Sequence, residues 1–100
     1  MARKKKLPSV KPPPIRPRFE DVERWLQNPN NTRTEFVIRA FVSHNRNVVT
    51  VVLVEHSTQY RSRLGSLVKL ANCPDAKTAR LAIEEIIDEL NQQGYKEVTK

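Results

Sequence analysis

The sequence predicts a small α+β domain that follows a basic, proline-rich N-terminal segment. Residues 33–43 read as a strand with Phe36, Ile38, Ala40 and Val42 on one face, and residues 47–56 are rich in the β-branched residues that favour strands. Residues 74–93 instead repeat their apolar side chains at the spacing of an amphipathic helix. Because the chain has 100 residues, it has room for a single such domain, which we place at residues 19–100.

The N-terminal segment, residues 1–18, carries the entire net charge of +7. It has no acidic residue, five of the seven prolines and few large apolar side chains, so we expect it to be disordered. An extended cationic segment binds phosphates by releasing their counterions. Its basic residues are therefore candidates for nucleic-acid contacts: Arg3, Lys4, Lys5, Lys6, Lys11, Arg16 and Arg18. Two alternatives stay open, a leader that only aids solubility and a ligand for proline-recognition domains at residues 11–17.

The first expected element of the domain is a short helix over residues 19–27. Phe19, Val22 and Leu26 have the i, i+3, i+7 spacing of a helical stripe, and acidic residues stand in the first turn. The helix ends before Pro29, because a proline pushes the preceding residue out of the helical conformation. Trp25 lies beside the stripe and is expected to anchor the helix in the core, with an exposed stacking role as the alternative.

Two strands are expected next, joined by a hairpin at residues 44–47. The second of them, residues 47–56, is rich in valine and threonine, which favour strands. In the first strand, alternation places four side chains on the buried face: Phe36, Ile38, Ala40 and Val42. The other face of that strand carries Glu35, Val37, Arg39, Phe41 and Ser43.

Residues 60–71 predict a third strand, bent or bulged at Gly65, with a helical turn over residues 66–71 as the rival. Regular alternation along this strand places its basic residues on one face: Arg61, Arg63 and Lys69. That face can coincide with the face that carries Arg39 and Phe41.

The last helix is expected over residues 74–93. Pro74 and Asp75 suit its start, and Gly94 suits the left-handed position that ends a helix. Four apolar side chains form its buried stripe: Ala79, Ile83, Ile86 and Leu90.

Residues 95–99 can add a short edge strand. The expected order is therefore α-β-β-β-α(-β), a small two-layer sandwich with an antiparallel sheet and both helices on one face. A domain of this size has a thin core, which dimerisation would stabilise.

This element order resembles that of the double-stranded-RNA-binding domain, which is also helix, three strands and helix over a similar span. That family begins its last helix with a Lys-Lys-x-Ala-Lys motif, whereas residues 75–80 supply only Lys77 and Arg80 as basic residues. Residues 64–70, followed by Ala79 and residues 82–83, also resemble the second half of an RNA recognition motif, without its stacking aromatics. We assign the chain to neither family.

The sequence contains no motif typical of an enzyme, a cofactor site or a metal site. His44 and His56 lie far apart in a turn and at a strand end, and no paired cysteines or glycine-rich phosphate loop accompany them. The lone cysteine, Cys73, excludes an internal disulfide and is expected to be a small apolar residue. We therefore expect no catalysis, no cofactor and no metal. Without a signal peptide or an apolar run that spans a membrane, a cytoplasmic protein is expected.

The face that carries Arg39 and Phe41 is the predicted binding surface of the domain, together with Arg61, Arg63 and Lys69. Arginines beside an aromatic ring on an open sheet can hold the phosphates and stack the bases of single-stranded RNA. Two other interpretations stay open, an ordinary solvated face and a dimer interface.

The sequence thus favours a small nucleic-acid-binding accessory protein, with RNA ahead of DNA as its partner. The basic segment would supply affinity, and the arginines of the strands would supply positioning. The alternative is a protein-interaction module or small subunit of a larger complex, possibly a homodimer, that uses the same segment on an acidic partner.

Overall fold

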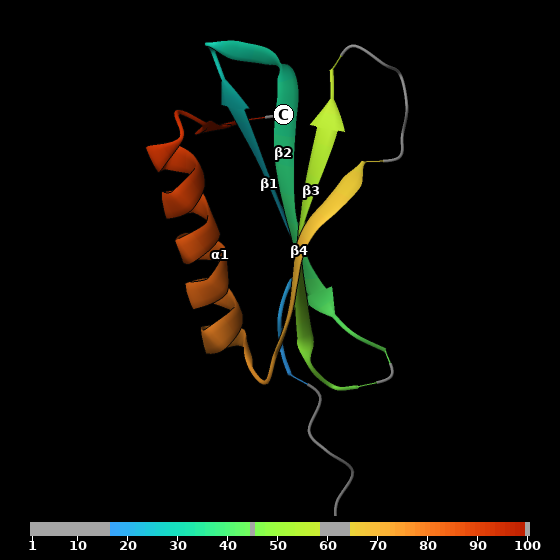
Figure 1. Cartoon of the computed structure of the whole chain (residues 1–100). Coiled ribbons are helices and arrows are strands. Elements are labelled where there is room, and N and C mark those ends of the chain that lie inside the picture. The colour runs from blue at the N-terminus through green and yellow to red at the C-terminus, as the bar shows by residue number, and fades with distance from the viewer. Residues whose placement is uncertain (1–16, 45, 59–64, 100) are drawn as a thin grey trace, which may run out of the picture.

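The computed structural model describes residues 17–44, 46–58 and 65–99, which form a five-stranded antiparallel sheet with one helix packed against a single face (Figure 1). The α+β class is confirmed, but the predicted order of elements, with a helix first and two helices on the sheet, is wrong. The elements are β1 (Val22–Asn28), β2 (Asn31–Val42), β3 (Val49–Ser57), β4 (Ser66–Cys73), α1 (Ala76–Gln92) and β5 (Lys96–Val98).

The strands lie in the order β4-β3-β2-β1-β5, and every neighbouring pair is antiparallel. The chain then crosses one face of the sheet through α1, from β4 at one edge to β5 at the other (Figure 1). Pro29 and Asn30 connect β1 to β2, and Asn28 Oδ1 accepts a hydrogen bond from Asn30 N at 2.8 Å. The β2–β3 connection contains Asn47 at φ 51°, a left-handed conformation that asparagine tolerates. The predicted hairpin between these two strands is therefore confirmed.

The helix predicted over residues 19–27 is wrong, because this part of the chain forms β1 from Val22 onward. Val22 and Leu26 satisfy the spacing of a helix and the alternation of a strand equally well. Arg24 lies between them on the side that faces α1, and a charged residue at an inward position hides the alternation. Its guanidinium is satisfied at the sheet edge by Glu97 of β5, whose carboxylate oxygens lie 2.5 and 2.6 Å from Nε and Nη2.

The third predicted strand is β4, so the rival helical turn is wrong. The irregularity predicted at Gly65 lies further along, at Val68. Position 65 requires glycine for a steric reason. A Cβ there would lie 2.3 Å from Val54 Cγ1 and 2.9 Å from the carbonyl oxygen of Glu55. Glycine therefore allows the chain to enter β4 in close contact with β3.

Both ends of α1 are closed as the sequence predicts. Asp75 is the N-cap, and its carboxylate accepts a hydrogen bond from Thr78 N at 2.8 Å. At the other end Gly94 adopts φ 96°, and Tyr95 N donates to Leu90 O at 2.9 Å. This pairing is the Schellman arrangement, which satisfies the last carbonyls of the helix.

The cap at Asp75 makes the stability of the domain depend on pH. The hydrogen bonds from Thr78 lower the pKa of Asp75 below its ordinary value of 3.8. Because the folded pKa is depressed, the cap contributes fully above that ordinary value and is lost as the pH falls through the folded pKa. We expect Asp75→Ala to lower Tm by several degrees at pH 7 and by progressively less in acid. Thermal melts followed by circular dichroism over this pH range measure the effect.

Asp75→Asn is the matched control for this cap. Its amide oxygen still accepts the hydrogen bond without a titrating charge, so its Tm should stay close to that of the parent at pH 7. A pH-independent difference between the parent and Asp75→Ala would contradict the assignment.

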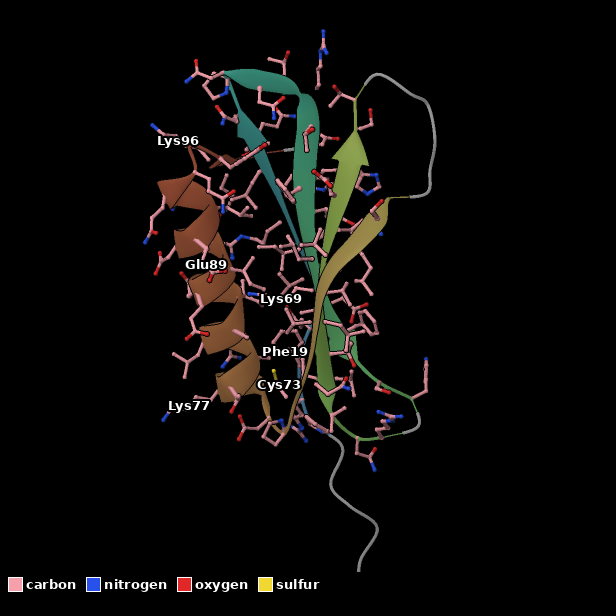
Figure 2. The ribbon with its side chains drawn as sticks, in the orientation of Figure 1. Phe19, Lys69, Cys73, Lys77, Glu89 and Lys96 are labelled. Carbon is pink, nitrogen blue, oxygen red and sulfur yellow. The ribbon has the colours of Figure 1, made fainter. Side chains whose placement is uncertain are left out.

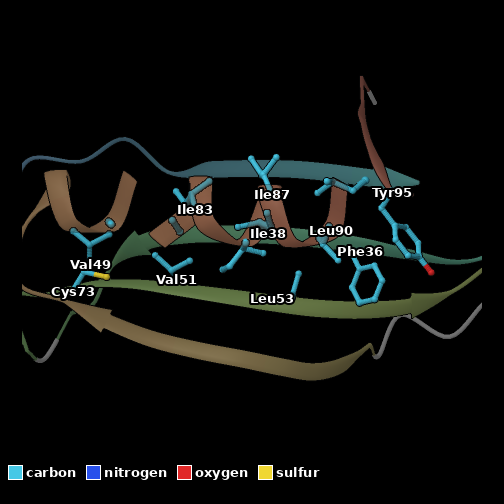
Figure 3. Close-up of a cluster of buried hydrophobic side chains, with 14 residues drawn as sticks. Phe36, Ile38, Val49, Val51, Leu53, Cys73, Ile83, Ile87, Leu90 and Tyr95 are labelled. Atoms are coloured by element: carbon cyan, nitrogen blue, oxygen red, sulfur yellow. The ribbon is translucent and has the colours of Figure 1, made fainter. Parts of the chain in front are cut away.

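The core lies between α1 and the face of the sheet that α1 covers (Figure 3). Tyr95 packs edge-on against Phe36, with the ring centroids 4.9 Å apart, and its hydroxyl accepts a hydrogen bond from Asn31. Burial is the main reason that the pKa of the Cys73 thiol is raised, so this side chain acts as the small apolar residue that was expected. The buried cluster is Leu26, Phe36, Ile38, Ala40, Val49, Val51, Leu53, Cys73, Ala79, Ile83, Ile86, Ile87, Leu90 and Tyr95.

Candidate nucleic-acid interface

The face of the sheet turned away from α1 has no helix over it in the part of the chain that the structure describes (Figure 1). We call it the open face. Arg39 and Phe41 both belong to it, as the alternation along β2 predicts, and the Phe41 side chain is 39% exposed. The strand registers place the following residues on this face: Glu23, Trp25, Gln27, Glu35, Val37, Arg39, Phe41, Thr50, Val52, Val54, His56, Leu67, Leu70, Asn72, Lys96 and Val98.

Arg39 is held by an ion pair across two strands. Its Nε lies 3.1 Å from Oε2 of Glu23, the residue opposite it on β1. Trp25 Nε1 donates to the other carboxylate oxygen of Glu23 at 2.9 Å. These contacts lower the pKa of Glu23, chiefly through the indole and secondarily through Arg39. Because an exposed ion pair of this kind is weak, Arg39 can exchange Glu23 for a phosphate at little cost.

Trp25 lies on the open face, so its predicted role as a core anchor beneath a helix is wrong. Its ring centroid is 5.8 Å from that of His56, and its cross-strand neighbour Val37 has no exposed surface. The indole therefore helps to cover Val37 as well as presenting an aromatic surface. The available sequence signal was that Val22 and Leu26 also fit a strand, which places Trp25 on the opposite face.

A β-bulge removes Lys69 from the open face. Leu53 pairs with Lys69, but the next residue of β3 pairs with Leu67, so Val68 is an extra residue in β4. One extra residue reverses the faces of the side chains on either side of it. Lys69 consequently lies on the helix side, where its Nζ is 3.2 Å from Glu89 Oε1 of α1 (Figure 2). The predicted grouping of Lys69 with Arg39 is wrong.

Of the other predicted site residues, Arg18 belongs to the residues that the structure describes and lies at the start of the fold. The remaining ones lie outside the described residues: Arg3, Lys4, Lys5, Lys6, Lys11, Arg16, Arg61 and Arg63.

The basic N-terminal segment joins the fold beside a groove of about 1360 Å³, which we call the arm-end groove. We call residues 1–16 the basic arm. Arg18 and Arg80 line the groove and form no ion pair with another described residue, so their guanidiniums are available for an anion. Phe41 borders both this groove and the open face. The groove is lined by residues 17–22, Arg24, residues 41–44, Arg80, Ile83 and Glu84.

The groove by itself is close to neutral. Arg18, Arg24 and Arg80 are balanced by three carboxylates in its lining, those of Glu20, Asp21 and Glu84. The described residues as a whole have nine basic and eleven acidic side chains, whereas the remaining residues have nine basic and no acidic ones. The positive charge that attracts a polyanion therefore belongs to the basic arm, to residues 59–64 between β3 and β4, and to Lys100.

The outer side of α1 opposes such attraction. Its exposed acidic side chains are Glu84, Glu85, Asp88 and Glu89, and acids four residues apart on a helix repel one another and any phosphate. A polyanion is therefore directed away from the outer side of α1, whereas at the arm-end groove the repulsion from Glu84 is offset by the arginines of the lining.

Other chemistry has little support within residues 17–44, 46–58 and 65–99. No group of three histidine, cysteine or acidic side chains there is arranged to hold a metal ion. The helix α1 is neither long enough nor apolar enough to cross a membrane. No family model matches the chain, and neither a curated protein nor a solved structure is detectably similar to it.

Sequence reasoning missed three contributors to this interface. Trp25 was assigned to the core, and Phe19 and Arg80 were treated as ordinary helix residues. Phe19 and Arg80 are distant in the sequence and meet only because residues 17–21 run beside the first turns of α1. Figure 2 shows Phe19, Cys73 and Lys77 at this same end of the fold.

Proposed function

We propose that the protein is a small nucleic-acid-binding accessory protein that prefers single-stranded RNA. The observation that carries the proposal is the position of Phe41. Its half-exposed ring borders the groove that the basic arm joins, beside two guanidiniums that form no ion pair with a described residue and an arginine in a weak ion pair.

In this proposal the arm and the domain have separate tasks. The basic arm supplies affinity that does not depend on base sequence, because it displaces counterions from phosphates. Arg18 and Arg80 then position the backbone at the groove, and Phe41 stacks on an unpaired base. The proposal includes no catalytic step and no cofactor.

A second candidate function has its own support. The open face carries Val52, Val54, Leu67 and Leu70 with few charges among them, which suits a protein partner better than a phosphate backbone. In that case the protein would be an interaction module, and its arm would contact an acidic partner.

Fluorescence anisotropy of the full-length chain with single-stranded RNA, duplex RNA and duplex DNA tests the first candidate. Stacking of one base is worth about 1–3 kcal/mol, so we expect Phe41→Ala to weaken binding of single-stranded RNA about tenfold. Binding to either duplex should change little, because paired bases are not free to stack on the ring.

Leu81→Ala is the matched control for this experiment. Leu81 is also an exposed apolar residue, but it lies on α1 outside the groove. Equal effects of the two substitutions would exclude Phe41 from the interface. Equal binding of all three nucleic acids, at low salt only, would favour the interaction module.

A further inference from the structure

The two edges of the sheet differ in how they are protected from further pairing. β5 has three residues and carries the exposed charge of Lys96, while Glu97 is paired with Arg24. β4 has eight residues and, within the described part of the chain, a strand neighbour only on the β3 side. Its one charged residue, Lys69, is occupied by Glu89. β5 is therefore short and carries an exposed lysine, whereas β4 is long and its one lysine is held in an ion pair; the bulge at Val68 leaves residues 69–73 as the regularly paired part of β4.

The apolar side chains of β4 are unusually exposed. Leu67, Val68 and Leu70 have 59%, 52% and 51% of their surface in contact with solvent. Leu67 and Leu70 lie on the open face beside Val54 and Val52 of β3, so the apolar surface continues from the edge toward the middle of the sheet. A partner at this edge would cover these side chains and pair with the backbone in the same contact.

We propose that β4 pairs with β4 of a second copy of the chain across a two-fold axis. The edge requires an occupant that is extended, uncharged and able to donate backbone hydrogen bonds. The basic arm fails this requirement, because its four prolines have no N–H and its charge is high. A second β4 meets it, since an antiparallel strand pair is compatible with a two-fold contact between identical surfaces.

Charge at the edge agrees with this occupant. Lys69 and Glu89 stand together on the helix side of β4 (Figure 2). A two-fold axis brings a second such pair to the same seam, so cations and carboxylates meet there in equal number. These two ion pairs add no net charge to the seam, whereas Arg61 and Arg63 make the sequence just before β4 basic.

The resulting dimer would have a continuous ten-stranded sheet, with both open faces on one side and a basic arm from each copy. It goes beyond the proposed function and does not depend on it, because self-association is measured without nucleic acid. The contact is small, so we expect a dissociation constant on the order of 10 µM.

Sedimentation velocity of the full-length chain, from about 1 µM to about 500 µM, tests the proposal. The parent should shift from its mass of 11.6 kDa to twice that mass as concentration rises. Leu67→Lys should raise the dissociation constant at least about tenfold, because it replaces exposed apolar surface at the contact with a charge that would have to lose its water. Leu81→Lys is the matched control, since Leu81 has the same 59% exposure on α1 and should leave association unchanged.

A second measurement covers the case in which Leu67→Lys fails to fold. Amide hydrogen exchange of the parent should show increased protection over residues 66–73 at high concentration, and none over residues 96–98. A parent that stays monomeric throughout, equal effects of the two lysine substitutions, or protection that does not change with concentration in β4 would each overturn the proposal.

Discussion

Replacing Arg3, Lys4, Lys5 and Lys6 with glutamine is expected to remove a large part of the salt dependence of nucleic-acid binding. Each phosphate neutralised on a single strand contributes about 0.7 to the slope of log affinity against log salt. Loss of four such contacts makes the slope shallower by about 3. Between about 50 and about 200 mM salt, the parent should then lose roughly 50-fold more affinity than the variant. Anisotropy titrations at four or five salt concentrations measure both slopes.

The substitution keeps the length of the arm, so a change in slope reports charge and not reach. A matched control replaces Lys77 with glutamine, because Lys77 is an exposed cation on α1, outside both the open face and the arm-end groove. Its slope should stay close to that of the parent. Equal slopes for the parent and the fourfold variant would show that the arm does not contact phosphates, and the proposed division of tasks would be wrong.

Ile38→Ala is expected to have the largest effect on stability. Ile38 lies in the middle of β2, has no exposed surface and packs in the cluster beneath α1 (Figure 3). Truncation of a buried isoleucine costs about 2–5 kcal/mol, through lost transfer energy and the cavity that remains. Small domains have a total free energy of unfolding near the lower end of about 5–15 kcal/mol. The variant should therefore lose a large part of its stability, as measured by urea unfolding followed by the fluorescence of Trp25, the single tryptophan.

Val52→Ala is the comparison for this experiment, because Val52 is half-buried on the neighbouring strand and on the open face. It removes a branched side chain from the same sheet without opening a cavity under α1, so it should cost less than half as much. Equal losses for the two variants would mean that the open face is as well packed as the helix side.

The elements that could be predicted from the sequence are those with a single consistent pattern. Residues 76–92 combine a helical stripe with a cap at each end, and β2 and β3 are long segments rich in β-branched and apolar residues around a short polar connection. In β1 the inward position of Arg24 broke the alternation, while the spacing of Val22 and Leu26 suited a helix. Arg24 is accommodated at that inward position by its ion pair with Glu97, and a contact between residues so far apart leaves no local signal.

The candidate site, like the fold, was predictable where the local pattern alone decides which face a side chain occupies. Alternation alone places Arg39 and Phe41 on one face, and the structure keeps them there. The face on which Lys69 lies depends on one extra residue, Val68, and the local composition of β4 does not predict that bulge. Trp25 was predicted in the core because β1 was predicted as a helix. The arm-end groove depends on the meeting of residues 17–21 with α1, which is a property of tertiary packing.

The pairing of β1 with β5 also determines the order in which the fold can form. The strands β1 to β4 join neighbours along the chain, so each hairpin closes a short loop at small entropic cost. Arg24 and Glu97 are 73 residues apart, and their strands can meet only after α1 has carried the chain across the sheet. Folding thus has a local stage and one long-range closure. Contacts between β1 and β5 are absent from the early stage, so we expect them to act mainly by slowing unfolding. The short edge strand β5 should therefore affect the unfolding rate more than the folding rate.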